Sequence, residues 1–540
     1  MRFHLKTILP LLVLAAAVGV YGPALHHPLI FDDFNLFERG SLNELFLRGF
    51  AFEVRWLPYF TMAWIDLIFD DRVFAQRCTS LAIHLLTAYV LYALIKQVSN
   101  HVAPHRHNER AALAAALLFA LHPLAVYAVG YLAQRTILLA TLFGLLSLST
   151  YFDGLVTRKK TYFFFSAFFY LLSVFSKEHA ILIPAVALAL TPLAGPVTKQ
   201  VWRGLLLPFS LYAAIAGFVV AGFLGIVGGV YEPLAAPLVE QHLPGRSPAS
   251  IWGLSVLTQA AMFFKYLGLM LIPYPGWMSI DMRVPVATSF GRPEYLLGLL
   301  ALVVYAAVSA IWLLRGGRRG LLGFALLAPL LLFVVEFSAV RIQEPFVLYR
   351  SYLWLALLFF LLPAVTPEWK GKVFWPVVLS VALAFAYASS DRLQSFSSEY
   401  ALWDDAVRKL PEARALGSAR AYANRGYENV KRGDFDAAIT DLTRALSVNP
   451  RHKRAYQMRA FAQAKLGNYQ AALDDANAFI RLDPADPVGY TVRGVVYQGK
   501  GDLDLAVSDF DRACKQAWPA ACIALGMARQ QAITWENKRQ

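Results

Sequence analysis

Two adjacent carboxylates follow the first apolar segment of the chain, Asp32 and Asp33 in Leu29-Ile-Phe-Asp-Asp-Phe34. A positioned carboxylate can act as a general base toward a hydroxyl group, and repulsion between neighbouring carboxylates raises the pKa of one of them. The alternative is a helix cap or an ordinary loop carboxylate without a chemical role. Asp32 and Asp33 are the candidate catalytic residues, with a slight preference for Asp33 because it lies further from the apolar run.

Basic side chains recur on segments that we expect on the same side of a membrane as the acidic pair. Arginine binds a phosphate through two N–H groups and lysine binds it as a point charge. Several of them around a carboxylate pair would form a site for an anionic, lipid-embedded substrate. The candidates are Arg55, Arg77, Arg135, Lys177, Lys265, Arg341 and Arg350.

Simple ion pairing is the structural alternative for these basic residues. Lys177 and Glu178 are adjacent and can pair at a helix turn, and Arg341 can pair with Glu344. At membrane depth ionisable groups are costly, so their gathering on one side favours a functional site.

His122, in Leu-His-Pro, can donate to a phosphate or can simply end a helix before the proline. A metal site from Asp32, Asp33 and His122 is a further alternative, although their spacing matches no common metal motif. We expect no required cofactor, and a divalent metal stays open. The chain has no G-x-x-x-x-G-K-[ST] loop, which argues against ATP-driven transport.

The composition excludes a purely soluble protein. Of 540 residues, 58% are hydrophobic and 16% are charged, with a mean hydropathy of +0.48, whereas soluble domains have about 25% charged residues. Apolar runs recur from Leu5 to about Ala388 and then stop. The sequence therefore predicts an all-α polytopic membrane helix bundle over 1–390, followed by a small extracytoplasmic domain over 391–540.

The apolar runs predict about eleven spans. The first is a retained signal anchor ending near Tyr21, and the others are 74–97, 111–126, 135–156, 161–176, 179–192, 204–228, 294–314, 321–337, 351–365 and 373–389. Run 251–272 contains Lys265 and is bounded by Pro273, so we expect a re-entrant or interfacial segment there.

Basic loops orient these spans, because Lys and Arg in short loops stay on the cytoplasmic side. With a cytoplasmic N-terminus, the basic or mixed-basic loops all fall inside: 101–110, 158–160, 199–203, 315–319 and 370–372. Before residue 391 there are 28 Lys and Arg against 18 Asp and Glu, so most of the +14 net charge belongs to the membrane part. This distribution favours contact with membrane lipid and argues against nucleic-acid binding.

A repeat of 34 residues occupies the last 120 residues. It superposes Arg425, Arg459 and Arg493, then three glycines, three alanines and Pro450 with Pro484; the glycines and alanines are Gly433, Gly467, Gly501, Ala438, Ala472 and Ala506. This is the tetratricopeptide pattern, in which each unit is a pair of antiparallel helices. We expect repeats at about 417–450, 451–484 and 485–518.

Cysteine usage adds little. Cys78, Cys514 and Cys522 include no C-x-x-C pair. Cys514 and Cys522 could pair in an oxidising compartment, but we expect two small buried thiols instead.

The order of these features resembles the transmembrane and tetratricopeptide-repeat protein O-mannosyltransferases and their bacterial relatives, within the GT-C fold of polyprenyl-phosphate-dependent glycosyltransferases. The resemblance rests on the acidic first outer loop, Leu121-His-Pro123, Ala133-Gln-Arg135, Ser176-Lys-Glu178 and the repeats. It implies that Asp32 or Asp33 is the catalytic base. It also implies that His122, Arg135, Lys177 and Glu178 line the active site.

The implied reaction moves a sugar from a polyprenyl-phosphate donor to Ser or Thr of an exported protein such as a pilin, with inversion. We assign donor-phosphate binding to Arg350, Lys177, Arg135, Arg341 and Lys265, and site lining to His122, Glu178 and Arg55. The acceptor protein would use the tetratricopeptide groove. The expected location is a bacterial inner membrane with the site in the periplasm; a lipid or glycan acceptor and a non-catalytic scaffold are the alternatives.

Overall fold

Helices form the whole of the regular structure. The computed structural model describes residues 13–37, 53–223, 235–366, 368–412 and 415–539, together with 42, 44, 47 and 229. Within these ranges the β-structure is one isolated antiparallel bridge between Met282 and Phe346. The all-α prediction is thus confirmed. The first part of the predicted signal anchor, much of the first outer loop and the end of the span predicted over 204–228 lie outside the described residues.

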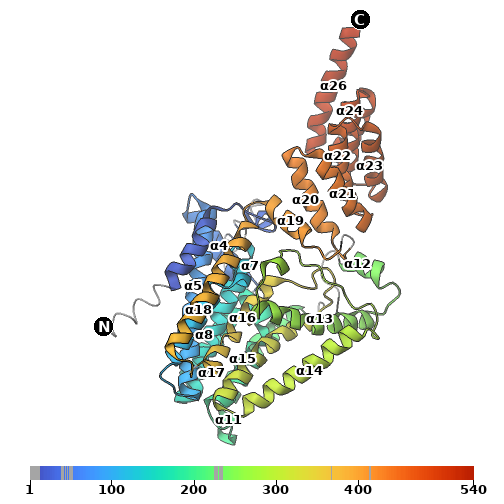
Figure 1. Cartoon of the computed structure of the whole chain (residues 1–540). Coiled ribbons are helices and arrows are strands. Elements are labelled where there is room, and N and C mark those ends of the chain that lie inside the picture. The colour runs from blue at the N-terminus through green and yellow to red at the C-terminus, as the bar shows by residue number, and fades with distance from the viewer. Residues whose placement is uncertain are drawn as a thin grey trace. The chain divides into compact units, whose positions relative to one another are not determined.

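The chain divides into two compact units. Unit 1 comprises Met1–Met282 and Val286–Ser398, and unit 2 comprises Arg283–Pro285 and Glu399–Gln540. Figure 1 shows the helices of each unit.

Unit 1 contains long apolar helices joined by short loops and 3-10 turns. Its α-helices are α2 Asp33–Phe37, α4 Trp56–Ile68, α5 Arg72–Val102, α6 Asn108–Ala120, α7 Val126–Val129, α8 Arg135–Thr157, α9 Lys160–Ser176, α10 Ile183–Ala194, α11 Lys199–Phe223, α12 Ala235–His242, α13 Pro248–Leu271, α14 Pro293–Leu314, α15 Gly317–Phe333, α16 Ser351–Leu358, α17 Leu361–Val365 and α18 Gly371–Gln394. The 3-10 turns near the site are η3 Leu132–Gln134, η4 Glu178–Leu182, η6 Val334–Phe337 and η7 Leu348–Arg350.

Close helix packing in unit 1 depends on small residues. Helices α8 and α9 pack against each other along their length. Helix α5 lies against α8, and both are labelled in Figure 1. A Cβ at Gly154 of α8 would lie 2.7 Å from the ring of Phe163 in α9, and one at Gly323 of α15 would lie 2.2 Å from the backbone nitrogen of Leu313 in α14. Glycine is therefore required where these helix pairs meet.

Eight described helical segments are long and apolar enough to cross a membrane, and a ninth is possible if the bent pair Asn108–Ala120 and Pro123–Val129 counts as one. Three shorter apolar helices are Val13–His26, Lys160–Ser176 and Glu178–Ala194. Length and composition thus give candidates close to the predicted spans.

Helix α13 covers the segment 251–272, which we expected to be re-entrant or interfacial. It is an unbroken helix of 24 residues that passes the length and hydropathy test for a span, so the chain does not turn back there, and the interfacial alternative stays a prediction. Lys265 does not interrupt it, because its ammonium lies 5.0 Å from the centre of the Phe346 ring. The long aliphatic stem of lysine packs along apolar surface, which makes a single lysine compatible with the helix.

Unit 2 is a stack of helix pairs. Three pairs match the predicted repeats: α20 Ala419–Arg432 with α21 Phe435–Val448, α22 Lys453–Lys465 with α23 Tyr469–Leu482, and α24 Pro487–Lys500 with α25 Leu503–Lys515. Helix α19 Glu399–Arg408 precedes them and α26 Pro519–Arg539 follows. The tetratricopeptide-like repeats are confirmed.

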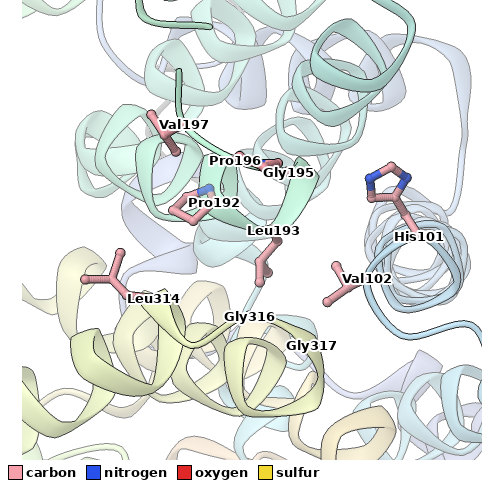
Figure 2. A pocket seen from close by; sticks show the side chains of 10 residues that line it. All are labelled: His101, Val102, Pro192, Leu193, Gly195, Pro196, Val197, Leu314, Gly316 and Gly317. Atoms are coloured by element: carbon pink, nitrogen blue, oxygen red, sulfur yellow. The ribbon is translucent and has the colours of Figure 1, made fainter. Parts of the chain in front are cut away.

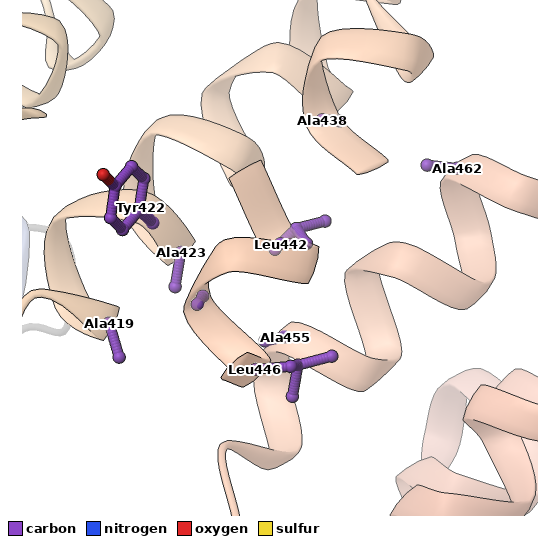
Figure 3. Packing of buried hydrophobic residues seen from close by; sticks show 9 residues of the cluster. Ala419, Tyr422, Ala423, Ala438, Leu442, Leu446, Ala455 and Ala462 are labelled. Atoms are coloured by element: carbon purple, nitrogen blue, oxygen red, sulfur yellow. The ribbon is translucent and has the colours of Figure 1, made fainter. Parts of the chain in front are cut away.

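The residues of the repeat have the expected structural roles. Gly433, Gly467 and Gly501 have φ of 78°, 80° and 96°, a conformation that favours glycine, and each ends the first helix of a pair. The three repeated alanines are fully buried. Figure 3 shows one of them, Ala438, in the cluster formed with Tyr422 and Leu442.

The repeated arginines join the helices of each pair. Arg425, Arg459 and Arg493 each bind both oxygens of an aspartate sixteen residues later, at distances of 2.7–2.8 Å, namely Asp441, Asp475 and Asp509. Bidentate pairs of this kind fix geometry as well as adding energy.

The same arginines also link one repeat to the preceding one. Arg459 Nη1 donates to Thr443 at 2.9 Å and Arg493 Nη1 donates to Asn477 at 2.8 Å, both on the second helix of the preceding pair. Arg425 Nη1 instead donates to Asp404 of α19 at 3.0 Å. Helix α19 therefore takes the place of a preceding second helix and closes that end of the stack.

The expectation of two separate thiols in unit 2 is wrong. Cys514, at the end of α25, forms a disulfide with Cys522, near the start of α26. The turn between the two helices brings the sulfur atoms together, which sequence spacing alone did not indicate.

We predict that this disulfide stabilises α26 on the stack. Closing so short a loop, with a sequence separation of 8, restricts the unfolded chain by roughly 2–3 kcal/mol. Cys514→Ser should therefore lower the free energy of opening of α26 by about that amount, measured by amide hydrogen exchange on the purified chain. Cys78→Ser is the matched control and should leave α26 unchanged. Equal protection in all three proteins would contradict the prediction.

Candidate functional site

A polar cavity of about 390 Å³ lies in unit 1. Four separated segments line it: the first outer loop, the turn before α8, the turn after α9 and the loop before α16. Its charged lining residues are Asp32, Arg55, Lys177, Glu178, Glu344 and Arg350. The fold thus brings together five of the residues that the sequence singled out, and adds Glu344.

Asp32 lies at the cavity. Its side chain accepts a hydrogen bond of 2.7 Å from the Tyr131 hydroxyl, and the residue is exposed. The hydrogen bond from Tyr131 orients the Asp32 carboxylate, and the side chain still lines the cavity. Asp32 can therefore accept a proton from a molecule bound in the cavity.

Asp33 lies behind the cavity and is fully buried at the start of α2. Its carboxylate accepts hydrogen bonds from the backbone N–H groups of Ala133 at 2.8 Å and Ile30 at 3.4 Å. Burial raises the pKa of Asp33 to about 7, against the opposing effects of these amides and of Arg77. We expected repulsion between the two carboxylates to raise a pKa, but burial is the cause. The geometry also reverses our preference, because Asp32 and not Asp33 reaches the cavity.

Arg77 holds the first outer loop in place. Its guanidinium donates to the backbone carbonyls of His27 at 2.9 Å, Pro28 at 2.5 Å and Gly130 at 2.8 Å. These bonds connect the segment before the acidic pair to the turn before α8. Arg77 is therefore a structural residue that also places a positive charge near Asp33.

The ion pairs at the cavity differ from those suggested by sequence neighbours. Glu178 pairs with Arg55, Nε to Oε2 at 3.1 Å and Nη2 to Oε1 at 2.5 Å. Arg55 and Glu178 lie 123 residues apart, so this pair joins the first outer loop to the turn after α9.

Arg341 pairs with Glu336 at 3.1 Å. Arg350 binds the same Glu336 at 2.9 Å and reaches Glu344 at 3.7 Å. Glu336 is 1% exposed, and His179 approaches its other oxygen at 3.2 Å. One buried carboxylate therefore holds the two arginines of the loop before α16.

Lys177 differs from the other cations of the cavity. It is 5% exposed and lines the cavity, yet its ammonium forms no salt bridge within the described ranges and lies 5.7 Å from the centre of the Tyr349 ring. Burial and, to a smaller extent, neighbouring Arg55 lower the pKa of Lys177 to about 7, against the opposing effect of Glu178. An anion in the cavity would supply the negative charge that Lys177 lacks.

Besides Asp33 and Arg341, three predicted site residues do not line the cavity. Arg135 is fully buried and donates to the Gln76 carbonyl at 2.7 Å. His122 is buried, its Nε2 lies 3.0 Å from the Met270 carbonyl, and its Nδ1 accepts from the Leu124 amide. Lys265 lies over Phe346. Arg135 and His122 are buried beside the turns that precede α8 and follow α6, where their hydrogen bonds hold the backbone.

Sequence reasoning missed Tyr131, His179, Glu336 and Tyr349, which contact the cavity residues. Glu336 had one usable signal, since it is a lone carboxylate at the end of an apolar run. In the described part of the chain no three His, Cys, Asp or Glu side chains form a metal site, so Asp32, Asp33 and His122 do not make one.

A second cavity of about 520 Å³ lies at the C-terminal ends of α5 and α10 and the N-terminal end of α15 (Figure 2). Glycine and apolar residues such as Leu193 and Leu314 line it, and His101 is the one titratable residue among them. Its lining has no acid–base pair, so the polar cavity is the better candidate for chemistry.

Comparisons with known proteins concern the repeats. A tetratricopeptide-repeat family profile matches residues 429–493. No curated protein matches the chain. Among solved structures, the first tetratricopeptide domain of Spaghetti (RPAP3) bound to the HSP90 peptide SRMEEVD is 23% identical, with a TM-score of 0.21, covering 22% of this chain and 94% of that one.

Two further structures are similar in the same way. The tetratricopeptide protein YrrB, described as having an unusual peptide-binding site, is 22% identical with a TM-score of 0.23 and covers 29% of this chain and 80% of that one. The Cut9–Hcn1 hetero-tetramer of the anaphase-promoting complex is 14% identical with a TM-score of 0.23 and 91% coverage of both chains. The profile match supports the tetratricopeptide part of the resemblance, and residues 429–493 are a tetratricopeptide-repeat segment.

We predict that anion binding in the polar cavity weakens as pH rises. Lys177, with a pKa of about 7, is protonated below that pH and neutral above it, whereas sulfate keeps its charge. Sulfate affinity, measured calorimetrically, should therefore fall about tenfold from pH 6 to pH 8. Lys177→Arg should remove most of this dependence. Asp33 becomes negatively charged over the same pH range and would also weaken sulfate binding, so Asp33→Asn measures how much of the pH dependence comes from Asp33. Identical pH profiles for the wild type and Lys177→Arg would refute the assignment.

Proposed function

We propose that unit 1 is a membrane glycosyltransferase that moves a sugar from a polyprenyl-phosphate donor to Ser or Thr of an exported protein. The observation that carries this proposal is the polar cavity, where Asp32 meets Lys177, Arg55 and Arg350 from distant parts of the chain. A base beside cations is what transfer to a hydroxyl from a phosphate-linked donor requires.

Lys177 and Arg350 are the proposed ligands of the donor phosphate. The bond between the anomeric carbon and the phosphate oxygen breaks during transfer, and negative charge grows on the phosphate. Cations already fixed in a site with little water stabilise that charge without reorganisation. Lys177 is the principal candidate because its charge has no salt-bridge partner in the described structure.

Arg55, Arg341 and Arg350 are each held by a carboxylate. The proposed part of Arg55 and Arg341 is therefore to shape the cavity. Arg350 lines the cavity, which places its guanidinium within reach of a phosphate bound there.

Asp32 is the proposed base. It takes the proton of the acceptor hydroxyl as that oxygen attacks the anomeric carbon from the side opposite the leaving phosphate, which gives inversion in one displacement. Tyr131 orients the Asp32 carboxylate through its 2.7 Å hydrogen bond. Asp33 fixes the turn that presents Asp32, through the backbone groups of Ala133 and Ile30.

Two other functions remain candidates. A GT-C enzyme with a lipid or glycan acceptor would use the same cavity. A non-catalytic membrane scaffold is favoured by the number of cavity charges that already have partners, such as Arg55 with Glu178. The unpartnered Lys177 ammonium favours an enzyme over the scaffold.

The proposed topology places unit 2 in the periplasm of a bacterial inner membrane. The Cys514–Cys522 disulfide supports an oxidising compartment. The parity of the spans depends on α13. If the long, bent and short apolar segments all cross, the described residues supply an even number, whereas an interfacial α13 leaves an odd number and puts unit 2 opposite a cytoplasmic N-terminus.

A reporter fusion tests this topology. We expect an alkaline phosphatase fused after Arg392 to be active, because the enzyme needs periplasmic oxidation, and a fusion after Lys160 to be inactive. The paired fusions control for expression. If both fusions are produced but inactive, α13 crosses the membrane and unit 2 lies in the cytoplasm.

We predict that Asp32→Asn abolishes sugar transfer. Removing a positioned base costs about two to four orders of magnitude in rate. The readout is the intact mass of exported proteins from cells with wild-type or variant chain, since a transferred sugar adds its residue mass. Asp66→Asn, a carboxylate that pairs with Arg72 away from the cavity, is the matched control and should keep the modification. Full modification with Asp32→Asn would exclude Asp32 as the base.

A further inference from the structure

Four residues with a side-chain amide or an aliphatic hydroxyl line the polar cavity, namely Asn35, Gln134, Thr136 and Gln343. The charged residues of the cavity can bind a phosphate and accept a proton, but a sugar ring is uncharged and offers only hydrogen-bonding groups. A site selects such a molecule through buried groups that need its hydroxyls as partners. A neutral side chain without a partner inside the protein is therefore a candidate to contact the sugar.

Gln134 meets this condition. Its side-chain oxygen Oε1 has no hydrogen-bond partner in the described part of the chain, and the residue is 6% exposed. Thr136 donates to the Ala133 carbonyl at 3.4 Å, and Asn35 and Gln343 take part in other interactions. A buried amide oxygen without a partner costs stability, so native proteins contain few of them. A bound molecule that donates to Gln134 would remove this cost.

The backbone is fixed on both sides of Gln134. Its own N–H donates to the Tyr131 carbonyl at 3.0 Å and closes the turn η3. The next residue, Arg135, is fully buried and donates to the Gln76 carbonyl at 2.7 Å. These bonds hold Gln134 at the cavity wall before any molecule binds. A side chain placed in advance loses less entropy on binding, which is a property of residues that recognise a ligand.

Gln134 also lies beside the proposed base. The Tyr131 hydroxyl donates to Asp32 at 2.7 Å, and the Ala133 N–H donates to Asp33 at 2.8 Å. Both donors belong to the turn that Gln134 ends. The acidic pair and the Gln134 amide are therefore neighbours at the cavity.

This position indicates which part of a sugar Gln134 would contact. Asp32 takes the proton of the hydroxyl that attacks the anomeric carbon, so that carbon lies close to Asp32 during transfer. The ring carbon bonded to the anomeric carbon is C2. The substituent on C2 is consequently the first hydrogen-bonding group of the sugar that a neighbour of Asp32 can reach.

A glutamine amide has an acceptor oxygen and two N–H donors. Rotation about the last side-chain bond exchanges its two ends, so either end can face the cavity while the backbone stays in place. A hydroxyl donates and accepts, and an acetamido group offers one N–H and one carbonyl. Both substituents can satisfy the amide, whereas a CH₂ group at C2 leaves it without a partner.

We infer that Gln134 is a specificity-determining residue for the donor sugar, binding a hydroxyl or acetamido group at C2 and selecting against a sugar that has only hydrogen there. This inference rests on the proposed function and names the class of sugar that the same cavity takes.

Calorimetry on the purified full chain tests this inference without any sugar transfer. The probes are farnesyl phosphate and its esters with glucose, mannose, N-acetylglucosamine and 2-deoxyglucose. The 2-deoxyglucose ester is the common reference, because it differs from each of the other three esters only at C2. We expect the tightest of those three to bind about tenfold more tightly than the reference, since the reference leaves a buried amide unsatisfied. Equal affinity of all four esters would overturn the inference.

Variants assign the difference to Gln134. Gln134→Leu and Gln134→Met each remove the amide and keep an apolar side chain of similar volume, and two variants guard against a single folding failure. In both, the tightest ester should fall to within about twofold of the reference, while farnesyl phosphate and the reference keep their affinities. Gln394→Leu is the matched control, since Gln394 is exposed at the end of α18 and outside the cavity. It should keep the full difference.

A tenfold difference that survives in both Gln134 variants would show that another group reads C2, and the inference would fail. The same titrations separate this failure from that of the proposed function. If neither farnesyl phosphate nor any ester binds, the polyprenyl-phosphate donor is rejected and this inference with it. If all the probes bind alike, the donor site is retained and Gln134 is not its sugar contact.

Discussion

Compensation of buried charge is the constraint on which the polar cavity depends. Glu336 is 1% exposed and binds Arg341 and Arg350 together. Removing one partner of a buried ion pair typically costs about 3–5 kcal/mol, because the remaining charge is left without compensation. Each charged group therefore fixes its neighbours, and the loop before α16 takes its position from η6. Lys177 is the exception, since it forms no salt bridge in the described structure, and for this reason we propose it as a ligand of the donor phosphate.

Long-range pairing explains which parts of the site the sequence could predict. The sequence could predict which segments contribute to the site, because polar residues between apolar runs mark the ends of helices, and Asp32, Lys177 and Arg350 all lie at the cavity. The sequence could not predict which charged residues pair. Arg55 and Glu178 are 123 residues apart, whereas the adjacent Lys177 and Glu178 appeared to be the natural pair. Periodicity reports the direction of a side chain within one helix and carries no information about which helix lies opposite.

The acidic pair shows the same limit at the scale of one residue. Phe31 has a φ of 51°, in the left-handed region, and α2 begins at Asp33. The backbone therefore turns just before the pair and enters α2 at its second residue, so that Asp33 is enclosed by backbone amides and Asp32 is exposed. Composition around the pair could not distinguish them, because a strained turn of this kind is set by the surrounding structure and not by local propensity.

The repeats were the most predictable part, because their period places the same contact three times. Gly433, Ala438 and Arg425 each have equivalents 34 residues on, and a chain that repeats its residue types must repeat its packing. What the period alone did not reveal is the partner of each arginine, an aspartate on the second helix that closes the pair. The third nitrogen of each arginine then bonds the preceding helix, so that one residue type fixes both the helix pair and its place in the stack.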